Sequence, residues 1–519
     1  RTPPTRPQRK LSHRRAVVRE KYTLVRYASR MKPLRMIALL ALLTLGACGG
    51  ADEPPGPVNT LERGLPTDPE TLDHHKARST QAAEVIRDLG EGLTSYSATG
   101  ELVPAAAHRW EIAEDGLTYT FHLREEARWS NGEPVTAHDF VAGMRRLVNP
   151  ATAGVYAEML IALENADGIV SGDIPVSMLG VEATDDYTLV LRLVQPTPYL
   201  LGLLSHPSTF PVNRGAIEEH GDTFARPGKL VSNGAYRLDA WVPGSIVSLK
   251  RNEHYWNNAG TAIDAVNYHV IVQDRSELNR YRAGELHITS TVPADSFAQV
   301  REEYADELHV APYLGVYYYG FNLSKEPFKD NLALREALSM AIDRDELASS
   351  VLGRGETAAY SWVPPGVNKY TPSQIGFVAL DKAEREQLAR ARYKEAGYGE
   401  GQPLQIELRY NTGDLHRKIA VAVQAMWRDV LGVEATLINE EFQVLLVNIR
   451  EAEITQVFRA SWMGDYNDAH SFLSVLQGGS PANMPRYASE QYDDLMERAA
   501  AHVDPERRRL YLEEAERVM

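Results

Sequence analysis

The chain has 519 residues, 44% of them hydrophobic and 24% charged, which allows roughly two to four domains with large cores. Its charge is unevenly divided: residues 1–47 carry 12 Lys/Arg and one Glu, a net charge of +11, whereas residues 48–519 carry the other 43 basic and 69 acidic residues, a net charge of −26. Nucleic acid and anionic lipid repel a body this acidic, so we expect no nucleic-acid partner.

The N-terminal residues have the pattern of a secretion signal. Residues 1–30 are basic without an amphipathic pattern, and we expect translation to start at Met31. Two basic residues then precede the apolar run Met36–Leu45, which is too short to span a bilayer. Leu45-Gly-Ala-Cys48 resembles a bacterial lipobox, so we expect cleavage before Cys48, a lipid on its thiol and amine, and a periplasmic or cell-envelope location. The alternative is an ordinary signal peptide with an incidental cysteine.

Cys48 is also the only cysteine, which excludes intrachain disulfides, CxxC redox chemistry and cysteine-based zinc sites. Residues 49–57 are rich in Gly and Pro and read as a tether. His74 and His75 could suggest a metal site, but adjacent histidines point apart on a strand and no third ligand is spaced to join them. We therefore expect no metal and no cofactor.

The first half of the body alternates strand and helix patterns. Thr136 and Asp139 form a capping-box pattern at the start of one helix, and Asn131-Gly132 marks a turn before it. The expected elements are a helix at Thr80–Leu89, a strand at Thr118–Arg124, a helix at Ala137–Leu147, a strand at Thr188–Val194 and a hairpin of Gly234–Trp241 with Ser245–Arg251.

The second half contains a β-α-β pattern. A strand at Leu404–Tyr410, a helix at Asp414–Leu431 and a strand at Val433–Asn439 predict a partly parallel sheet with ligand sites at its carboxyl edge. The other expected elements are strands at Val266–Val272 and His309–Asn322, a helix at Glu277–Ala283, two helices within Asn331–Leu352 broken near Asp343, and a helix that Asp381 and Glu384 cap and that stops at Gly397.

The stretch Val457–Asn467 gathers charge and aromatic rings. Val457 and Phe458 are expected to end an apolar strand, and Arg459, Trp462, Asp465 and Tyr466 then follow. Side chains two apart share a face of an extended chain, so some of this set can converge. A carboxylate beside aromatic walls suits an ammonium group. The alternative is a strand ending in a turn, with Asp465 capping amides, Arg459 pairing locally and Trp462 in the core.

Catalytic motifs are missing from the sequence. It contains no phosphate-binding G-x-x-x-x-G-K-[ST] loop, no G-x-S-x-G elbow and no H-E-x-x-H helix. A hydrolase using His416 with Asp414 or Asp465 would lack both a nucleophile and a metal set. We therefore expect a binding protein, not an enzyme.

Several blocks, taken together in order over roughly residues 59 to 519, resemble bacterial ABC-transporter solute-binding proteins of family 5, the oligopeptide-binding and murein-peptide-binding lipoproteins. The blocks are Pro104–Trp110, Phe121–Arg124, Trp129–Gly132, Thr136–Phe140, Ser232–Tyr236, Tyr255–Asn258, Tyr410–His416 and Arg459–Asn467. The resemblance implies an α/β fold of the periplasmic-binding-protein-like type II, with two ligand lobes that close on a cleft and an inserted third domain. It places lobe I at 48–92 and 215–316, the inserted domain at 93–214 and lobe III at 317–519. Relatives also return to lobe I through a C-terminal segment, and we expect this sequence to stop short of it.

The resemblance also implies roles for single residues. Asp465 matches the carboxylate that binds a peptide's α-ammonium, and Arg459, His416 and Arg450 match groups that meet ligand carboxylates. Trp462 and Phe442 match aromatic walls, Tyr156 a tyrosine reaching in from the inserted domain, and Asn483 an amide that contacts the peptide backbone. The remaining positions expected near the ligand are Met463, Gly464, Thr80, Arg78 and Gly320.

Two departures from the family pattern bear on specificity. Gly320 stands where the oligopeptide binder carries a glutamate, and Arg78 stands where an acid is expected. Together with Arg450 they make the expected cleft more positive and favour peptides with extra carboxylates, of which murein-type peptides are one class. The alternative places Arg78 and Arg450 on the surface.

The function that follows from the resemblance is that of a monomeric, lipid-anchored receptor that delivers oligopeptides to a membrane ABC permease. Backbone contacts and the terminal charges would hold the peptide. Binders of a dipeptide, a murein tripeptide, haem or an opine in the same family are the alternatives.

Overall fold

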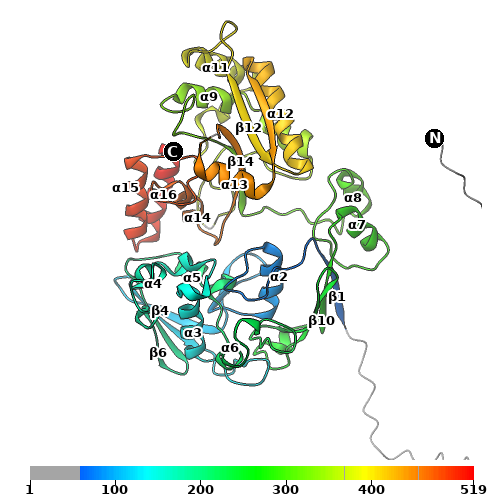
Figure 1. The fold of residues 1–519 in the computed structure, drawn as a ribbon, viewed down its shortest axis with the longest axis vertical. Helices are drawn as coiled ribbons and strands as arrows, with labels where there is room; N and C mark the ends of the chain where they lie inside the picture. The colour runs from blue at the N-terminus through cyan, green and yellow to red at the C-terminus, as the bar shows by residue number, and fades with distance from the viewer. Residues whose placement is uncertain (1–58, 368, 454) are drawn as a thin grey trace, which may run out of the picture. The chain divides into compact units, whose positions relative to one another are not determined.

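Three four-stranded sheets organise the chain in the computed structural model, which describes residues 59–367, 369–453 and 455–519 (Figure 1). The expected signal sequence, Cys48 and the tether lie outside the described residues. A two-stranded pair, β2 (Thr94–Tyr96) with β3 (Leu102–Pro104), completes the sheet structure of this part of the chain. Residues 59–519 form one compact unit.

The first sheet has the order β1-β10-β9-β8 and joins the start of the described chain to residues 236–270. β1 runs parallel to β10, and the other two pairings are antiparallel. Val85, Ile86 and Leu89 of one helix pack against this sheet in a shared core. The elements are β1 (Thr60–Leu65), β8 (Tyr236–Val242), β9 (Ile246–Arg251), β10 (Ala265–Val270), α2 (Thr80–Leu89), α6 (Arg214–His220), α7 (Asp274–Arg282) and α8 (Phe297–Glu303).

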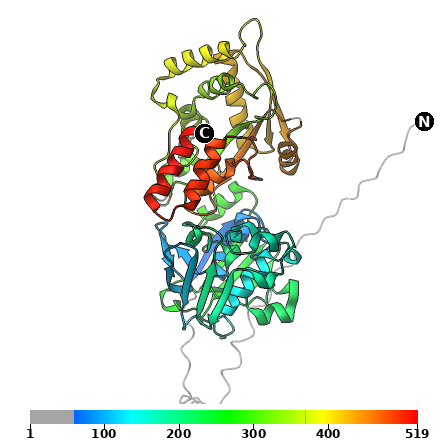
Figure 2. The same cartoon turned by 90° about the vertical axis from the view of Figure 1, so that its left-hand side faces the viewer.

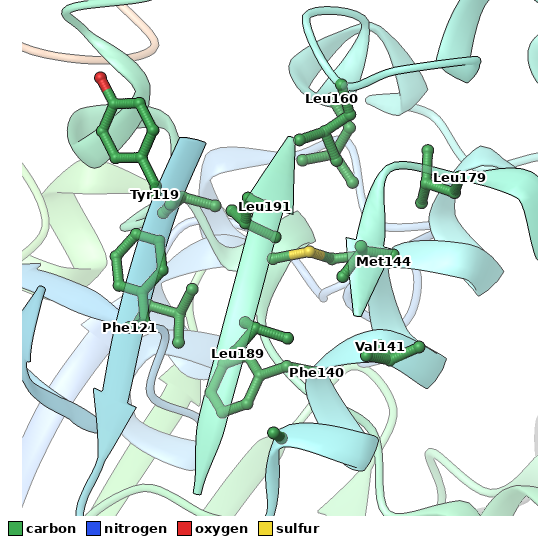
Figure 3. Close-up of a cluster of buried hydrophobic side chains, with 14 of the residues drawn as sticks. Tyr119, Phe121, Phe140, Val141, Met144, Leu160, Leu179, Leu189 and Leu191 are labelled. Atoms are coloured by element: carbon green, nitrogen blue, oxygen red, sulfur yellow. The ribbon is translucent and has the colours of Figure 1, made fainter. Parts of the chain in front are cut away.

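The second sheet, β4-β5-β7-β6, is antiparallel throughout. Tyr119, Phe121 and Leu123 alternate along β5 and are buried, so one face of the sheet is apolar. Phe140 and Met144 pack on that face, as Figure 3 shows. The elements are β4 (Ala107–Ile112), β5 (Thr118–Leu123), β6 (Val181–Asp185), β7 (Thr188–Arg192), α3 (Ala137–Val148), α4 (Ala166–Val170) and α5 (Leu200–Leu203).

The third sheet is mixed, with the order β11-β14-β12-β13. β12 runs parallel to both β13 and β14, whereas β11 and β14 are antiparallel. Leu408 and Tyr410 pack against Ile419 and Trp427, which places the long helix over one face of the sheet. The elements are β11 (Gly315–Phe321), β12 (Gln405–Asn411), β13 (Glu434–Glu440), β14 (Val457–Met463), α9 (Leu332–Met340), α10 (Arg344–Glu346), α11 (Lys382–Glu395), α12 (Asp414–Leu431) and α13 (Phe442–Glu451).

Three further helices follow β14: α14 (His470–Leu473), α15 (Glu490–Ala501) and α16 (Pro505–Val518). Figures 1 and 2 both show α15 and α16 side by side, and the two helices are in contact. Tyr492, Leu495 and Leu512 are buried in the core that they share with α14.

Most of the predicted elements are confirmed, with small shifts at their ends. The α2 and α12 bounds are as expected, and the capping boxes at Thr136/Asp139 and Asp381/Glu384 are both formed. The expected strand at His309–Asn322 is shorter, since β11 begins at Gly315. The proposed limits of the three domains stay a prediction, although each sheet draws its strands from one of the three expected regions, apart from the first two residues of β11.

The expectation that His74 and His75 point apart on a strand is wrong. Both lie in a turn, and their ring centroids are 4.3 Å apart. Burial lowers the pKa of His74 to about 4, so the ring is neutral. Asp73, which precedes the two histidines and is buried, forms an ion pair of 2.7 Å with Arg146 of α3, and this pair links the turn to the 93–214 region. Within the described residues no group of three or more His, Cys, Asp or Glu is arranged to hold a metal ion.

Candidate ligand-binding site

The strand β14 sorts the predicted site residues onto two faces. Instead of ending at Phe458, the strand begins at Val457 and runs to Met463, because all seven residues pair with β11. Arg459 stands opposite Tyr319, and Trp462 stands opposite Val316, on the other face. Arg459 and Trp462 therefore do not converge, whereas Asp465 lies beyond the strand, in the loop before α14.

Arg459 is a half-buried cation held by neutral groups. Its Nη1 donates to Asn411 Oδ1 at 3.2 Å, its Nη2 donates to Ser461 Oγ at 3.3 Å, and its guanidinium lies 4.6 Å from the centre of the Tyr317 ring. In the described part of the chain no carboxylate lies within ion-pairing distance of Arg459. A cation that is positioned but not neutralised can bind an anionic group of a ligand.

His416, near the start of α12, joins the same group of residues. Its ring stacks near Tyr317, with centroids 5.8 Å apart, and its Nδ1 lies 3.3 Å from the Tyr317 hydroxyl. Burial, and then the charge of Arg459, lower the pKa of His416 to about 4. The resemblance predicts a cationic group here, but at neutral pH the histidine is an uncharged hydrogen-bonding group.

Asp465 is half-buried, and its carboxylate is not used by the protein. Its backbone N–H donates to Ser471 Oγ at 2.9 Å, which fixes the loop. Across residues 59–519, outside the two gaps at 368 and 454, its carboxylate oxygens make no hydrogen bond and no ion pair. The alternative interpretation, in which Asp465 caps backbone amides and Arg459 forms a local ion pair, is therefore wrong on both points. Burial, followed by the charge of Glu158, raises the pKa of Asp465 to about 6.

Tyr156 lies close enough to Asp465 for the two groups to interact electrostatically. Burial, and then the charge of Asp465, raise the pKa of the Tyr156 hydroxyl. Its ring packs edge-on against His206, with centroids 4.8 Å apart. The structure thus brings a tyrosine of the 93–214 region close to Asp465, and the roles of the two residues toward a ligand stay a prediction.

Glu158 is a residue that the sequence reasoning missed. Its side chain is exposed, yet partial desolvation raises its pKa, and its charge acts on Asp465. The next residue, Met159, packs with Leu203 and Tyr466 in a small buried cluster. A carboxylate two positions after a tyrosine of the 93–214 region carries no sequence signal by itself, so only the fold shows its proximity to Asp465.

The face of the third sheet opposite Arg459 carries three more of the predicted positions: Gly320 on β11, and Phe442 and Arg450 on α13. Phe442 begins α13 and is 44% exposed, and Arg450, near the end of α13, is also exposed. A Cβ added at Gly320 would lie 2.4 Å from the ring of the buried Phe458. The ring thus fills the space that a side chain at position 320 would need.

Three of the other predicted positions have structural contacts of their own. Trp462 Nε1 donates to the Ser471 carbonyl at 2.7 Å, and its half-buried ring packs against the core that contains α14, so its place as an aromatic wall of the ligand site stays a prediction. Gly464 N–H donates to the Leu314 carbonyl at 2.9 Å. Asn483 is buried, and its amide bonds to backbone carbonyls of its own turn. Met463, Arg78 and Thr80 are exposed.

A cavity of 2960 Å³ opens beside the third sheet. Tyr317, Tyr319 and Gly320 line it, together with residues from the segment 278–313. Asp465 and Arg459 are not among its lining residues.

Comparison with known proteins places the chain in a family. The model of bacterial extracellular solute-binding proteins, family 5, matches residues 101–484. The chain belongs to this family. The periplasmic oligopeptide-binding protein OppA of Escherichia coli K12 is 38% identical over 485 residues, which cover 92% of this chain and 89% of OppA. The probable deoxycholate-binding periplasmic protein YgiS of the same strain is also 38% identical, over 90% of this chain and 87% of YgiS.

The same relationship appears among solved structures. The murein tripeptide-binding protein MppA of Escherichia coli superimposes with a TM-score of 0.77 at 35% identity, over 89% of this chain and 90% of MppA. The predicted fold class, the type II periplasmic-binding fold with two ligand lobes and an inserted domain, is confirmed. Members of family 5 are solute-binding proteins, not enzymes. In the part of this family member that the structure describes, no helix has the length and apolar character needed to cross a bilayer.

Proposed function

We propose that this family 5 protein is the extracytoplasmic, lipid-anchored peptide receptor of an ABC importer. One observation carries the proposal: Asp465 and Arg459 are half-buried groups of opposite charge, and neither has an ionic partner in the described chain. Groups buried without a partner cost free energy, so such groups persist where a ligand supplies the partner. An oligopeptide carries an ammonium for Asp465 and a carboxylate for Arg459.

The contacts along the peptide are those of an added strand. Backbone hydrogen bonds hold a ligand without regard to its side chains, and roomy, hydrated pockets accept many side chains at little cost. In the proposed site Asp465 and Tyr156 bind the free amino terminus, while Arg459, with His416 as a neutral partner, binds a carboxylate. Trp462 and Phe442 would form aromatic walls, with Met463 and Gly464 beside Asp465.

The exposed cations Arg450 and Arg78 would add positive charge at the mouth of the site. Gly320 has no carboxylate to offset them, and the Phe458 ring occupies the space that a side chain there would need. Peptides that carry extra carboxylates, including murein-type peptides, are the ligand class that these three positions favour. Thr80 and Asn483 are the remaining positions proposed to lie near the peptide.

Isothermal titration calorimetry with trialanine tests the proposal. Asp465→Asn keeps the side-chain shape but removes the charge, and we expect it to weaken trialanine binding by about 2–5 kcal/mol. N-acetyl-trialanine should bind wild type worse by a similar margin and should bind both proteins alike. Equal affinity of wild type for the free and the acetylated peptide would overturn the assignment.

A bile acid is the second candidate ligand, because YgiS is as similar to this chain as OppA is. Deoxycholate offers a carboxylate for Arg459 but no ammonium for Asp465. Desolvating the unpaired Asp465 beside a sterol would be unfavourable, so the free carboxylate favours the peptide. Deoxycholate binding that is tighter than trialanine binding and unaffected by Asp465→Asn would reverse this preference.

The anchor and the importer are tested separately. Cys48 should incorporate labelled palmitate in a bacterial host, and Cys48→Ala should release the protein from the membrane fraction. Release of ligand to a membrane permease requires hinge motion between the lobes, and a ligand-dependent change in small-angle scattering would report it. Membrane retention of the unlabelled Cys48→Ala protein would contradict lipid anchoring.

A further inference from the structure

The ring of Tyr199 is packed among side chains from a distant part of the chain. Tyr199 precedes α5, yet its ring lies parallel to that of Tyr466, with centroids 5.0 Å apart and an interplanar angle of 8°. It also stacks on His470 of α14, at 4.3 Å and 18°, and the guanidinium of Arg508 lies 5.4 Å from its centre. The contact thus joins the 93–214 region to the 317–519 region, whose helices α5 and α14 are labelled in Figure 1.

Tyr466 is the residue that directly follows Asp465, and its ring is buried. Its hydroxyl lies 2.8 Å from His470 Nδ1, so the ring is held at its far end by its own loop. Leu203 and Met159 close around it in a buried cluster. The ring of Tyr466 is therefore enclosed partly by its own loop and partly by residues of the 93–214 region.

Gly202 shows how closely the two regions approach. A Cβ added at Gly202 would lie 3.2 Å from the Cβ of Tyr466 and 3.1 Å from the Tyr96 hydroxyl. Glycine leaves room for both neighbours, and any larger residue would press on Tyr466. On the other side, two hydrogen bonds of 2.8 Å from Arg508 hold Asp468, three residues beyond Asp465.

We propose that Tyr199 is a positioning residue for the ammonium site: by stacking on Tyr466 it fixes the adjacent Asp465 and keeps its carboxylate enclosed. This inference rests on the proposed function, in which Asp465 binds a peptide's free amino terminus. An ion pair is stronger where water is excluded, and it depends steeply on distance, so movement of the loop by one ångström weakens it. Since Tyr199 and Asp465 belong to different regions, the carboxylate reaches its binding position only where the two regions meet.

The test compares Tyr199→Ala with Tyr199→Phe in the full chain, with trialanine and N-acetyl-trialanine as probes. We expect Tyr199→Ala to weaken trialanine binding about tenfold, the size of effect typical of a lost aromatic pair, and to change N-acetyl-trialanine binding less than about twofold. Tyr199→Phe keeps the stacked ring and should bind both probes like wild type. Tyr398→Ala removes one ring of the Tyr393–Tyr398 stack and serves as the matched control, with no expected effect on either probe.

The pH profile separates positioning from a general loss of structure. In wild type the carboxyl group of Asp465 has a pKa of about 6 because it is buried. If Tyr199→Ala opens the loop, the pH at which trialanine binding is half lost should move toward that of an ordinary aspartate. Tyr199→Phe should leave that midpoint unchanged.

Gly202→Ala provides an independent variant with Tyr199 intact, since the added methyl presses on Tyr466. Gly202→Ala should also weaken the binding of trialanine more than the binding of N-acetyl-trialanine. Equal weakening of both probes in both variants, or no weakening in either, would overturn the role of Tyr199. If Asp465→Asn removes the preference for trialanine while Tyr199→Ala leaves it undiminished, the positioning inference alone fails. If Asp465→Asn leaves the preference intact, the proposed function fails with it.

Discussion

Arg459 and Asp465 are six positions apart, yet the chain holds the two groups in different ways. Arg459 points from a strand, and neutral side chains and a ring fix its guanidinium directly. Asp465 sits in a loop, where a backbone N–H is fixed and the carboxylate is left free. Uncharged hydrogen-bond acceptors can fix a guanidinium and leave its positive charge unneutralised. When only the backbone N–H of an aspartate is fixed, its carboxylate oxygens stay available to a ligand.

A nearby ion pair, Arg508 with Asp468, contrasts with these two unpaired groups. Arg508, on α16, makes two hydrogen bonds to Asp468, and the two side chains are 9% and 22% exposed. This ion pair is satisfied inside the protein, so we assign it to stability. Arg459 and Asp465 are not satisfied, so we assign them to binding. The predictions below test this division.

Removal of the paired cation should give the largest effect on stability. Arg508→Leu leaves Asp468 partly buried without its partner, and we expect the free energy of unfolding to fall by about 3 kcal/mol. Urea denaturation of the purified protein measures it. Arg509→Leu on the same helix removes a more exposed arginine, which pairs with Glu513 and Glu506, and should cost less than about 1 kcal/mol. Equal losses of unfolding free energy in the two variants would show that the buried ion pair stabilises the protein no more than the exposed one does.

Arg459→Met should show the opposite profile. The variant removes a cation that has no ionic partner, so the free energy of unfolding should change by less than about 1 kcal/mol. Trialanine binding should weaken by about 1.5–3 kcal/mol, the value of a hydrogen bond to a charged group, while trialanine amide should bind the variant and wild type alike. Calorimetry with the acid and the amide measures both. A stability loss as large as that of Arg508→Leu would show that Arg459 is structural.

The fold was predictable from the sequence because its signals are local. The alternation of Tyr119, Phe121 and Leu123 and the capping boxes at Thr136 and Asp381 act within a few residues of each other. The β-α-β pattern at residues 404–440 likewise gave the parallel pair β12–β13. From the sequence, Val457 and Phe458 are expected to end a strand, but β14 begins there. Apolar residues occur at both the beginning and the end of a short strand, and only the pairing with β11 distinguishes the two.

The site was predictable in part. Asp465 and Tyr156 could be named from the family pattern, but the surroundings of His416 and the position of Glu158 could not. The neutral state of His416 depends on Tyr317 and Arg459, which are 99 and 43 positions from it along the chain. The packing of Tyr199 on Tyr466 joins two regions whose approach no local pattern encodes.

The raised pKa of Asp465 gives opposite pH effects on binding and on stability. Ammonium binding needs the ionised carboxylate, so trialanine affinity should fall below pH 6 and approach a tenfold loss per pH unit. In the ligand-free protein the same group, with its folded-state pKa above 3.8, contributes stability that is present below pH 3.8 and is lost as the pH rises through 6. Titrations at pH 7.0, 6.0 and 5.0 in wild type and Asp465→Asn measure the first effect. If wild type and Asp465→Asn lose affinity in parallel as the pH falls, the pH dependence belongs to another group.

His416 should give the smallest effect, because it belongs to the cationic side of the site without being a cation. Its folded-state pKa of about 4 lies below 6.5, so the stability linked to its neutral form is present above pH 6.5 and is lost as the pH falls toward 4. His416→Gln retains a neutral hydrogen-bonding group, and we expect trialanine binding at pH 7 to weaken by less than about 1 kcal/mol, less than for Arg459→Met. The affinity of wild type should also stay level between pH 6.5 and 8, since His416 does not titrate there. A rise in affinity from pH 8 to pH 6.5 that His416→Gln abolishes would show that the ring is charged when the ligand binds, and Arg459 would then share its role with a second cation.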